Sequence, residues 1–194
     1  MKPSEPQYLS ALCEVCHAIS SVFDLQEVLS LIVKSAVESM KVKAGSLRLL
    51  DEEERRLEIV AAYGLSKEYL KKGPVEVEKS PIDGEALMGR VVTILDVTKD
   101  GRFQYLEEAE KEGICSVLCV PLRIRGRAIG VIRVYTSAPH EFTEYQTKLL
   151  YTLACHGTIA IENARLREHI ERDYEDLVRD VWRWYDWGAR PPKP

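Results

Sequence analysis

The run GICSVLCVPLRIRGRAIGVIRVYT at residues 113–136 constrains the fold of this chain more than any other stretch. β-Branched and other apolar residues dominate both of its halves, and Arg125 and Gly126 stand midway between them. A tight turn between paired strands needs a residue that tolerates positive φ, which glycine does without steric penalty. The run therefore predicts two long antiparallel strands joined at these two residues.

Two helices are predicted before any strand. Apolar residues recur at helical spacing over residues 8–22, which predicts a helix with a single buried stripe. Asp24, followed three residues later by Glu27, matches a capping box and predicts a second helix that reaches Met40. The stripe of the first helix consists of Leu9, Leu12, Cys13, Cys16, Ile19 and Phe23.

The remaining chain alternates strand and helix signals. Residues 44–50 and 57–63 predict a strand hairpin around a charged turn, and residues 66–113 form an irregular segment. Within that segment we expect helical pieces at 66–71, 83–88 and 104–112 and a short strand at 91–95. A long helix is predicted from Glu144 onwards. The order of these elements indicates an α+β domain.

The end of the long helix is rich in aromatic residues. Trp182, Trp184 and Trp187 lie close together and place rings around most of a helix. Such residues mark interfaces, so we expect contact with a second protomer or with a signalling partner in trans; the alternative is packing against the same domain. A strict heptad that begins at Leu166 puts Asp173 and Asp180 in its seam. The predicted interface residues are Leu166, Ile170, Tyr174, Leu177, Val181, Trp182 and Trp184.

Composition excludes several function classes. The formal net charge is −4 with both signs interspersed, which argues against a nucleic-acid surface. No apolar run approaches the roughly 20 residues that span a bilayer, and the polar start carries no signal-peptide pattern, so we expect a cytoplasmic protein without a membrane span. Five cysteines in such a chain indicate reduced thiols.

Three motifs near the end resemble one family. VPL-xx-RG-xx-IGVIRVY, F-T-x-x-Q and AIENARL, together with the order of elements over residues 9–166, resemble the GAF domain. The resemblance implies a central antiparallel sheet with N- and C-terminal helices on one face and a small-molecule pocket on the other. It also implies a regulatory role and a homodimer through the terminal helices. It predicts a tail at 1–7, the domain at 8–166, a helical extension at 167–188 and a tail at 189–194.

Strand alternation places polar side chains on the pocket face. Ser46 and Arg48 oppose Leu47, and Arg133 and Tyr135 oppose Val134. In GAF domains the first strand neighbours the last, so the resemblance brings the two arginines together. Two guanidinium groups in one partly buried pocket need an anion, either a carboxylate or phosphate ligand or nearby acids. The candidate neutralising acids are Asp96, Asp100 and Glu58.

The irregular segment offers a further hypothesis. The hypothesis is a thiolate sensor, or a metal held by Cys115 with Asp96 or Asp100; the alternative is that Cys115 and Cys119 are small core hydrophobes. No cofactor, catalytic residue or metal ligand set is assigned. The predicted ligand-binding residues are Ser46, Arg48, Arg133, Tyr135, Asp96 and Cys115.

Specialised members of the family fit less well. Thr136 and Ser137 stand where cyclic-nucleotide GAF domains carry Asn-Lys, and residues 66–114 hold neither the cysteine nor the histidine of bilin photoreceptors. Cys115 and Cys119 lie roughly 13 Å apart along one strand, too far for a disulfide of the kind expected in a free methionine sulfoxide reductase. A CxxCH run at 13–17 resembles a haem attachment motif, but without export the helical stripe explains it better.

These observations leave three function classes open. The favoured hypothesis is a non-catalytic sensor that couples a ligand in the pocket to its terminal helices. The first alternative is a ligand-free interaction module, in which the protein's own side chains plug the pocket. The second is a thiol-dependent enzyme of the sulfoxide reductase type.

Overall fold

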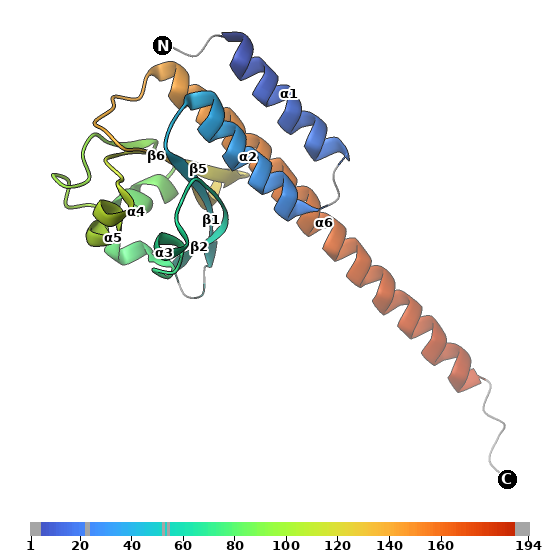
Figure 1. Ribbon diagram of the computed structural model, residues 1–194. Helices are drawn as coiled ribbons and strands as arrows, with labels where there is room; N and C mark the ends of the chain where they lie inside the picture. Colours follow the sequence, from blue (N-terminus) through green and yellow to red (C-terminus); the bar gives the residue numbers. More distant parts are fainter. Residues whose placement is uncertain (1–4, 22–23, 52, 54, 189–194) are drawn as a thin grey trace. The chain divides into compact units, whose positions relative to one another are not determined.

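The computed structural model describes residues 5–21, 24–51, 53 and 55–188. Its sheet contains six strands in the order β3-β2-β1-β6-β5-β4, and all the pairs between them are antiparallel (Figure 1). The α+β prediction is therefore confirmed. The strands are β1 (Ala44–Asp51), β2 (Arg56–Tyr63), β3 (Val75–Glu76), β4 (Val92–Ile94), β5 (Ser116–Ile124) and β6 (Arg127–Thr136).

The predicted central hairpin is confirmed as β5 and β6. Arg125 and Gly126, the two residues of its turn, have φ angles of 48° and 88°. Positive φ at both central positions matches the right-handed twist of the strands, and glycine takes the second position without strain. β6 also pairs with β1, with Ser46 opposite Arg133, so the first and last strands are neighbours as the resemblance implied.

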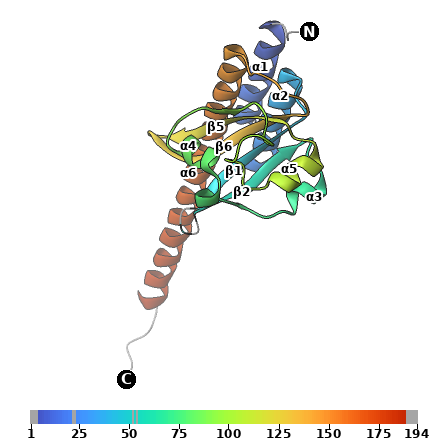
Figure 2. The same cartoon turned by 90° about the vertical axis from the view of Figure 1, so that its left-hand side faces the viewer.

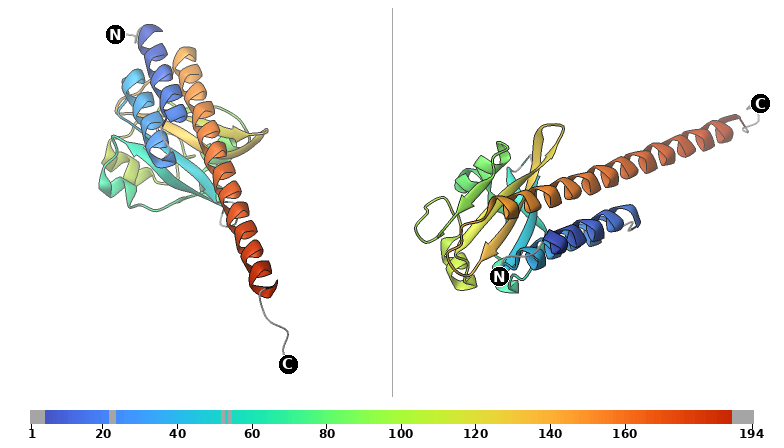
Figure 3. Two further views of the ribbon diagram at one scale, coloured as in Figure 1. Left: turned by 90° about the vertical axis from the view of Figure 1, so that its right-hand side faces the viewer. Right: turned by 90° about the horizontal axis from the view of Figure 1, so that it is seen from above.

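One face of the sheet is covered by helix α2 (Leu25–Met40) and by residues 144–160 of helix α6 (Glu144–Gly188), which lie side by side in Figure 3. Asp24 caps α2 by accepting a hydrogen bond from the Gln26 backbone N–H at 2.7 Å, which confirms the predicted start. A Cβ atom added at Gly157 would lie 3.5 Å from Ile32 and from Leu122. The α6 segment therefore packs closely against both α2 and β5.

Helix α1 (Glu5–Ser21) packs on α2, and its predicted buried stripe is only partly correct. Val15 and Ala18 are buried, whereas Leu9, Cys13 and Cys16 are exposed. The reason is that α1 packs against α2 rather than against the sheet, so a narrower strip of its surface is buried than the prediction assumed. The helix begins inside the predicted tail at 1–7, and Phe23 of the predicted stripe, with Val22, lies outside the described residues.

The irregular segment covers the opposite face of the sheet. Figure 2 views the molecule from the side on which this segment lies. Its apolar side chains form a second core with those of β5 and β6. The short helices predicted there are present, and a 3-10 helix at Val77–Lys79 and strand β3 were not predicted. The helices of this cover are α3 (Lys67–Leu70), α4 (Pro81–Leu87) and α5 (Leu106–Glu112).

The chain divides into two compact units, with the boundary between Ala160 and Ile161. The second unit is helical as far as Gly188, and the predicted tail at 189–194 lies outside the described residues. All seven predicted interface residues are exposed, from 58% for Leu166 to 81% for Trp184. Within the described ranges, no helix combines the length and the apolar character that crossing a membrane requires.

Candidate ligand-binding site

Two arginines from neighbouring strands lie buried between the sheet and its cover. Arg48 on β1 is fully buried and Arg133 on β6 is 1% exposed. Because Arg133 pairs across the strands with Ser46, Arg48 is its diagonal neighbour on the same face. The alternation of the two strands therefore predicted correctly that these side chains share one face.

Asp83 on α4 neutralises Arg133. Its Oδ2 atom forms an ion pair with Nη2 of Arg133 and accepts a hydrogen bond from the Ser80 hydroxyl at 2.7 Å. Burial by itself would lower the pKa of Arg133, but the Asp83 carboxylate raises it well above the ordinary value. The Phe103 ring, 5.5 Å from the guanidinium carbon, adds a cation–π contact.

Arg48 is hydrogen-bonded to a neutral group, and no ion pair joins it to an acid of the described residues. Its Nη1 atom donates to the Tyr135 hydroxyl at 3.1 Å, and that hydroxyl lies 2.9 Å from the Ser46 hydroxyl. Its Nε and Nη2 atoms are buried and have no hydrogen-bond partner in the described part of the chain. A guanidinium that is both buried and incompletely paired costs free energy unless another group supplies acceptors.

Lys72, which follows α3, brings a third basic group to the cluster. Its Nζ atom is buried, has no hydrogen-bond partner among the described residues, and lies 4.5 Å and 4.1 Å from the ring centroids of Tyr69 and Tyr105. Burial, together with the charges of Arg48 and Arg133, lowers the pKa of this amine to about 6. The amine is therefore mainly neutral at pH 7 as long as no anion is present.

The structure thus brings together four of the six predicted ligand-binding residues, namely Ser46, Arg48, Arg133 and Tyr135. It adds three that the sequence analysis did not select: Tyr69, Lys72 and Asp83. The sequence did carry one signal for Asp83. It is an acid in the first turn of a predicted helix, where acids commonly cap the helix. Lys72 and Tyr69 carried no signal, since only the fold turns the α3 region toward β1.

The acids expected to neutralise the arginines do not do so. Asp96 accepts from the Thr98 hydroxyl at 2.6 Å and pairs with Lys99, and Asp100 pairs with Arg102. Glu58 lies on an exposed position of β2. That prediction is wrong for these three acids because Asp83, which was not among the named candidates, reaches Arg133 through the packing of α4 on β6.

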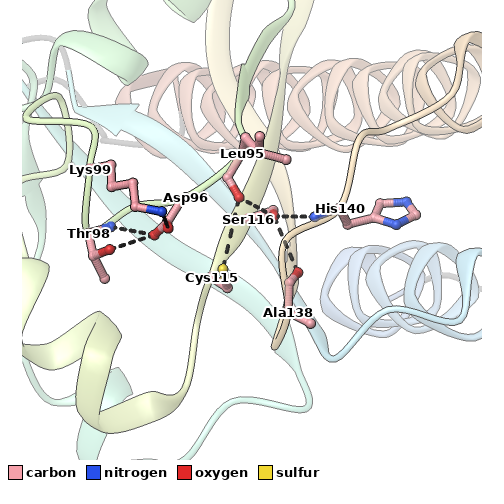
Figure 4. A network of polar contacts seen from close by, with 8 residues as sticks. All are labelled: Leu95, Asp96, Thr98, Lys99, Cys115, Ser116, Ala138 and His140. Atoms are coloured by element: carbon pink, nitrogen blue, oxygen red, sulfur yellow. Dashed lines mark hydrogen bonds and ion pairs between the residues drawn. The ribbon is translucent and has the colours of Figure 1, made fainter.

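Asp96 and Cys115 belong to a different polar network (Figure 4). The Cys115 thiol points to the Leu95 carbonyl oxygen at 3.9 Å, and the Ser116 hydroxyl donates to the same oxygen at 2.6 Å. No group of three or more His, Cys, Asp or Glu side chains suited to a metal ion occurs within residues 5–21, 24–51, 53 and 55–188. None of the hydrogen bonds of Asp96 and Cys115 described above joins them to the arginine cluster.

Cys119 does lie at the arginine cluster, opposite Arg133 on β5. Its thiol is fully buried, and burial raises its pKa to about 12 despite the nearby guanidinium groups. A thiol with this pKa is not a nucleophile near neutral pH. Cys119 therefore fits the alternative of a small core hydrophobe.

Comparison with known proteins identifies the fold. The family model described as GAF domain matches residues 24–162. The GAF domain of an Acinetobacter phosphoenolpyruvate-protein phosphotransferase is 25% identical, with a TM-score of 0.70, and the match covers 86% of this chain and 99% of that one. The GAF domain of the corresponding Coxiella burnetii protein is 20% identical, with a TM-score of 0.76 and the same coverage.

An enzyme has the same fold. Free methionine-R-sulfoxide reductase from Neisseria meningitidis, solved with its substrate, is 20% identical with a TM-score of 0.70, over 84% of this chain and 95% of that one. No curated protein matches the sequence.

Proposed function

The chain belongs to the GAF domain family, a ligand-binding fold of signalling proteins, and we propose that it is a non-catalytic module that binds a small anion. The supporting observation is the buried pair Arg48 and Arg133, which has one carboxylate, Asp83, for two guanidinium groups. An anion beside the free edge of Arg48 would supply the missing acceptors and offset the second charge.

The two alternatives fit the cluster less well. A pocket plugged by the protein's own side chains should satisfy its buried polar groups, yet six polar atoms of the described residues have no hydrogen-bond partner there. A thiol-dependent reductase needs a reactive thiolate, and Cys119, the cysteine beside the arginines, has a pKa raised to about 12 by burial. We therefore favour binding over turnover.

Thermal unfolding with a panel of small anions tests this proposal. The panel contains monocarboxylates, dicarboxylates, 2-oxo acids, inorganic oxyanions and nucleoside monophosphates. At a concentration a hundred times Kd, a ligand stabilises by about 2.7 kcal/mol, which raises the Tm of a domain of this size by roughly 5–10 °C. At least one anion should do so for the wild type, and Arg48→Met should abolish the shift.

Two controls make this result specific. Arg90→Met removes an exposed arginine and should leave the shift unchanged. Arg48→Lys keeps the charge but removes the two-pronged donor, so it should weaken the shift without abolishing folding. The proposal fails when no anion stabilises the wild type, or when Arg48→Met and Arg90→Met respond alike.

We further propose that occupancy of this site is coupled to self-association through the second unit. Ile170, Tyr174, Leu177, Val181 and Trp184 recur in steps of four and three and are all exposed, at 59–81%. A seam that starts at Ile170 rather than Leu166 is a regular heptad over this stretch and keeps aspartates out of its core. A second copy of the same helix would cover the whole stripe.

Charge favours a parallel pair of such helices. In this register Asp173 and Asp180 flank the seam at equivalent positions. Antiparallel helices would bring the aspartates of the two copies together, whereas parallel helices place them opposite Val178 and Tyr185. Truncation after Leu166 should convert a dimer to a monomer in sedimentation velocity. An oligomeric state that is the same before and after truncation would contradict this part of the proposal.

A further inference from the structure

The buried polar atoms without partners are unequal in kind. Arg48 Nε and Nη2, Arg133 Nε and Lys72 Nζ bear N–H groups, and Tyr69 Oη is a hydroxyl; only Asp83 Oδ1 is solely an acceptor. Buried polar groups in folded proteins are almost always hydrogen-bonded to protein, water or ligand. A molecule that completes this set must present several acceptor oxygens and a single donor.

These atoms belong to one cluster, although they come from β1, β6, α3, α4 and the residues that follow α3. The Lys72 amine lies 4.5 Å from the centroid of the Tyr69 ring, and Arg133, the ion-pair partner of Asp83, is the diagonal neighbour of Arg48 across β6 and β1. The Tyr69 ring lies 6.5 Å from the ring of Tyr135, whose hydroxyl accepts from Arg48. These contacts place the unpartnered atoms of the five residues within one buried cluster.

The charges of the cluster set the charge of that ligand. Arg48 and Arg133 are cations, Asp83 offsets one of them, and the Lys72 amine becomes a third cation when it takes up a proton. Glu108, the other acid that influences Lys72, is half-buried and lines a cavity of about 520 Å³ with Tyr69 and Lys111. A doubly charged anion would therefore balance the inner cluster and hold Lys72 in its protonated form.

We propose that the ligand of this site is a doubly charged anion that carries one hydroxyl group, as hydrogenphosphate and the 2-hydroxydicarboxylates do. Its hydroxyl donates to Asp83 Oδ1, and its other oxygens accept from Arg48, Arg133 and Lys72. This inference rests on the proposed anion-binding function and adds to it the charge and the one donor of the ligand.

Asp83 then discriminates between ligands of equal charge. An anion without a hydroxyl group would set an oxygen lone pair against the Asp83 carboxylate and leave Oδ1 unsatisfied. A binding site that hydrogen-bonds a ligand hydroxyl rejects the analogue that lacks it, because a buried polar group then loses its partner. We therefore expect at least about a tenfold difference in Kd within a pair that differs only in this group.

Two matched pairs of anions test the inference by isothermal titration calorimetry at pH 7.5. Inorganic phosphate is compared with sulfate, and malate with succinate, so that each pair differs chiefly in one hydroxyl group. The hydroxyl-bearing member of at least one pair should bind the wild type at least about tenfold more tightly. Which pair shows the preference distinguishes a phosphate group from a hydroxydicarboxylate.

Two variants connect the preference to its residues. Asp83→Asn removes the repulsion and supplies an amide donor, so the preference within the pair should disappear while sulfate or succinate binds more tightly. Lys72→Met should weaken the binding of both members of a pair about equally and preserve the preference for the member with the hydroxyl group. It also keeps the experiment informative when Asp83→Asn does not fold.

The outcomes separate this inference from the proposed function. Equal binding within both pairs, lost in Arg48→Met, would overturn the hydroxyl inference and leave the anion site intact. Absence of binding by all four probes would also overturn it, and the wider anion panel then decides independently whether the site binds anions at all. A hydroxyl preference that survives in a folded Asp83→Asn protein would show that Asp83 is not its cause.

Discussion

Arg133 on β6 and Asp83 on α4 form a completely buried ion pair, although fifty residues separate them in the chain. The pair joins the sheet to the cover of the candidate site. Breaking such a pair leaves an uncompensated charge in the interior, which typically costs about 3–5 kcal/mol, whereas replacing both partners by apolar residues costs much less.

We therefore predict that Asp83→Ala lowers the free energy of unfolding by about 3–5 kcal/mol in urea titrations. The double variant Asp83→Leu/Arg133→Met should be more stable than Asp83→Ala, since it leaves no buried charge at this position. The single variants Asp83→Leu and Arg133→Met complete a cycle with this double variant. Strictly additive changes in the free energy of unfolding would contradict the contact between the two side chains.

The Lys72 amine should make stability depend on pH. Its pKa is about 6 in the folded protein and near 10.5 in the unfolded chain, so between these values the unfolded state binds more protons. Stability therefore rises with pH across this window, by at most about 1.4 kcal/mol per pH unit, and the gain is absent below pH 6.

Urea unfolding of the wild type and of Lys72→Met at pH 6.5, 7.5 and 8.5, in buffers free of small oxyanions, measures this effect. The wild type should gain stability relative to the variant at each step. Lys71→Met, which removes the adjacent exposed lysine, should track the wild type. Parallel pH profiles for the wild type and Lys72→Met would show that the amine is charged in the folded protein.

Gly130 on β6 allows β1 to approach at Arg48. A Cβ atom at this glycine would lie 2.2 Å from the Arg48 carbonyl oxygen, a backbone atom that cannot move without shifting the strand. Gly130→Ala should therefore destabilise the domain by about 1–3 kcal/mol or more and disturb anion binding as well. Gly101→Ala, where a Cβ atom meets nothing within 4 Å, should change stability by less than about 0.5 kcal/mol.

Thiol labelling distinguishes the cysteines. Cys13, Cys16 and Cys155 are exposed, whereas Cys119 is buried with a raised pKa. In the native protein, Ellman's reagent should label the exposed thiols, and Cys119 should react only after unfolding. Mass spectrometry of the labelled peptides identifies each site. Rapid labelling of Cys119 in the native protein would contradict its burial and restore the thiol-dependent alternative.

Local patterns in the sequence were sufficient for the hairpin at the centre of the sheet and for the face on which the arginines lie. The β-branched residues on both sides of Arg125 and Gly126 predicted β5 and β6, since a two-residue turn with positive φ joins adjacent antiparallel strands. The shift in register between Leu122 and Arg123 was not predicted. Alternation along β1 and β6 placed Ser46 with Arg48, and Arg133 with Tyr135, on one face of their strands, because side chains of period two cannot change face within a regular strand. That the two strands are neighbours came from the resemblance to GAF domains.

The partners of these arginines were decided by tertiary structure alone. Asp83 and Lys72 lie in short elements of the irregular segment, whose positions depend on packing against β5 and β6 rather than on local periodicity. For the same reason α1 buries Val15 and Ala18 instead of its cysteines, since contact with α2 selects the covered face. Sequence thus determined the central hairpin and which side chains of a strand share a face, and packing determined which charges meet.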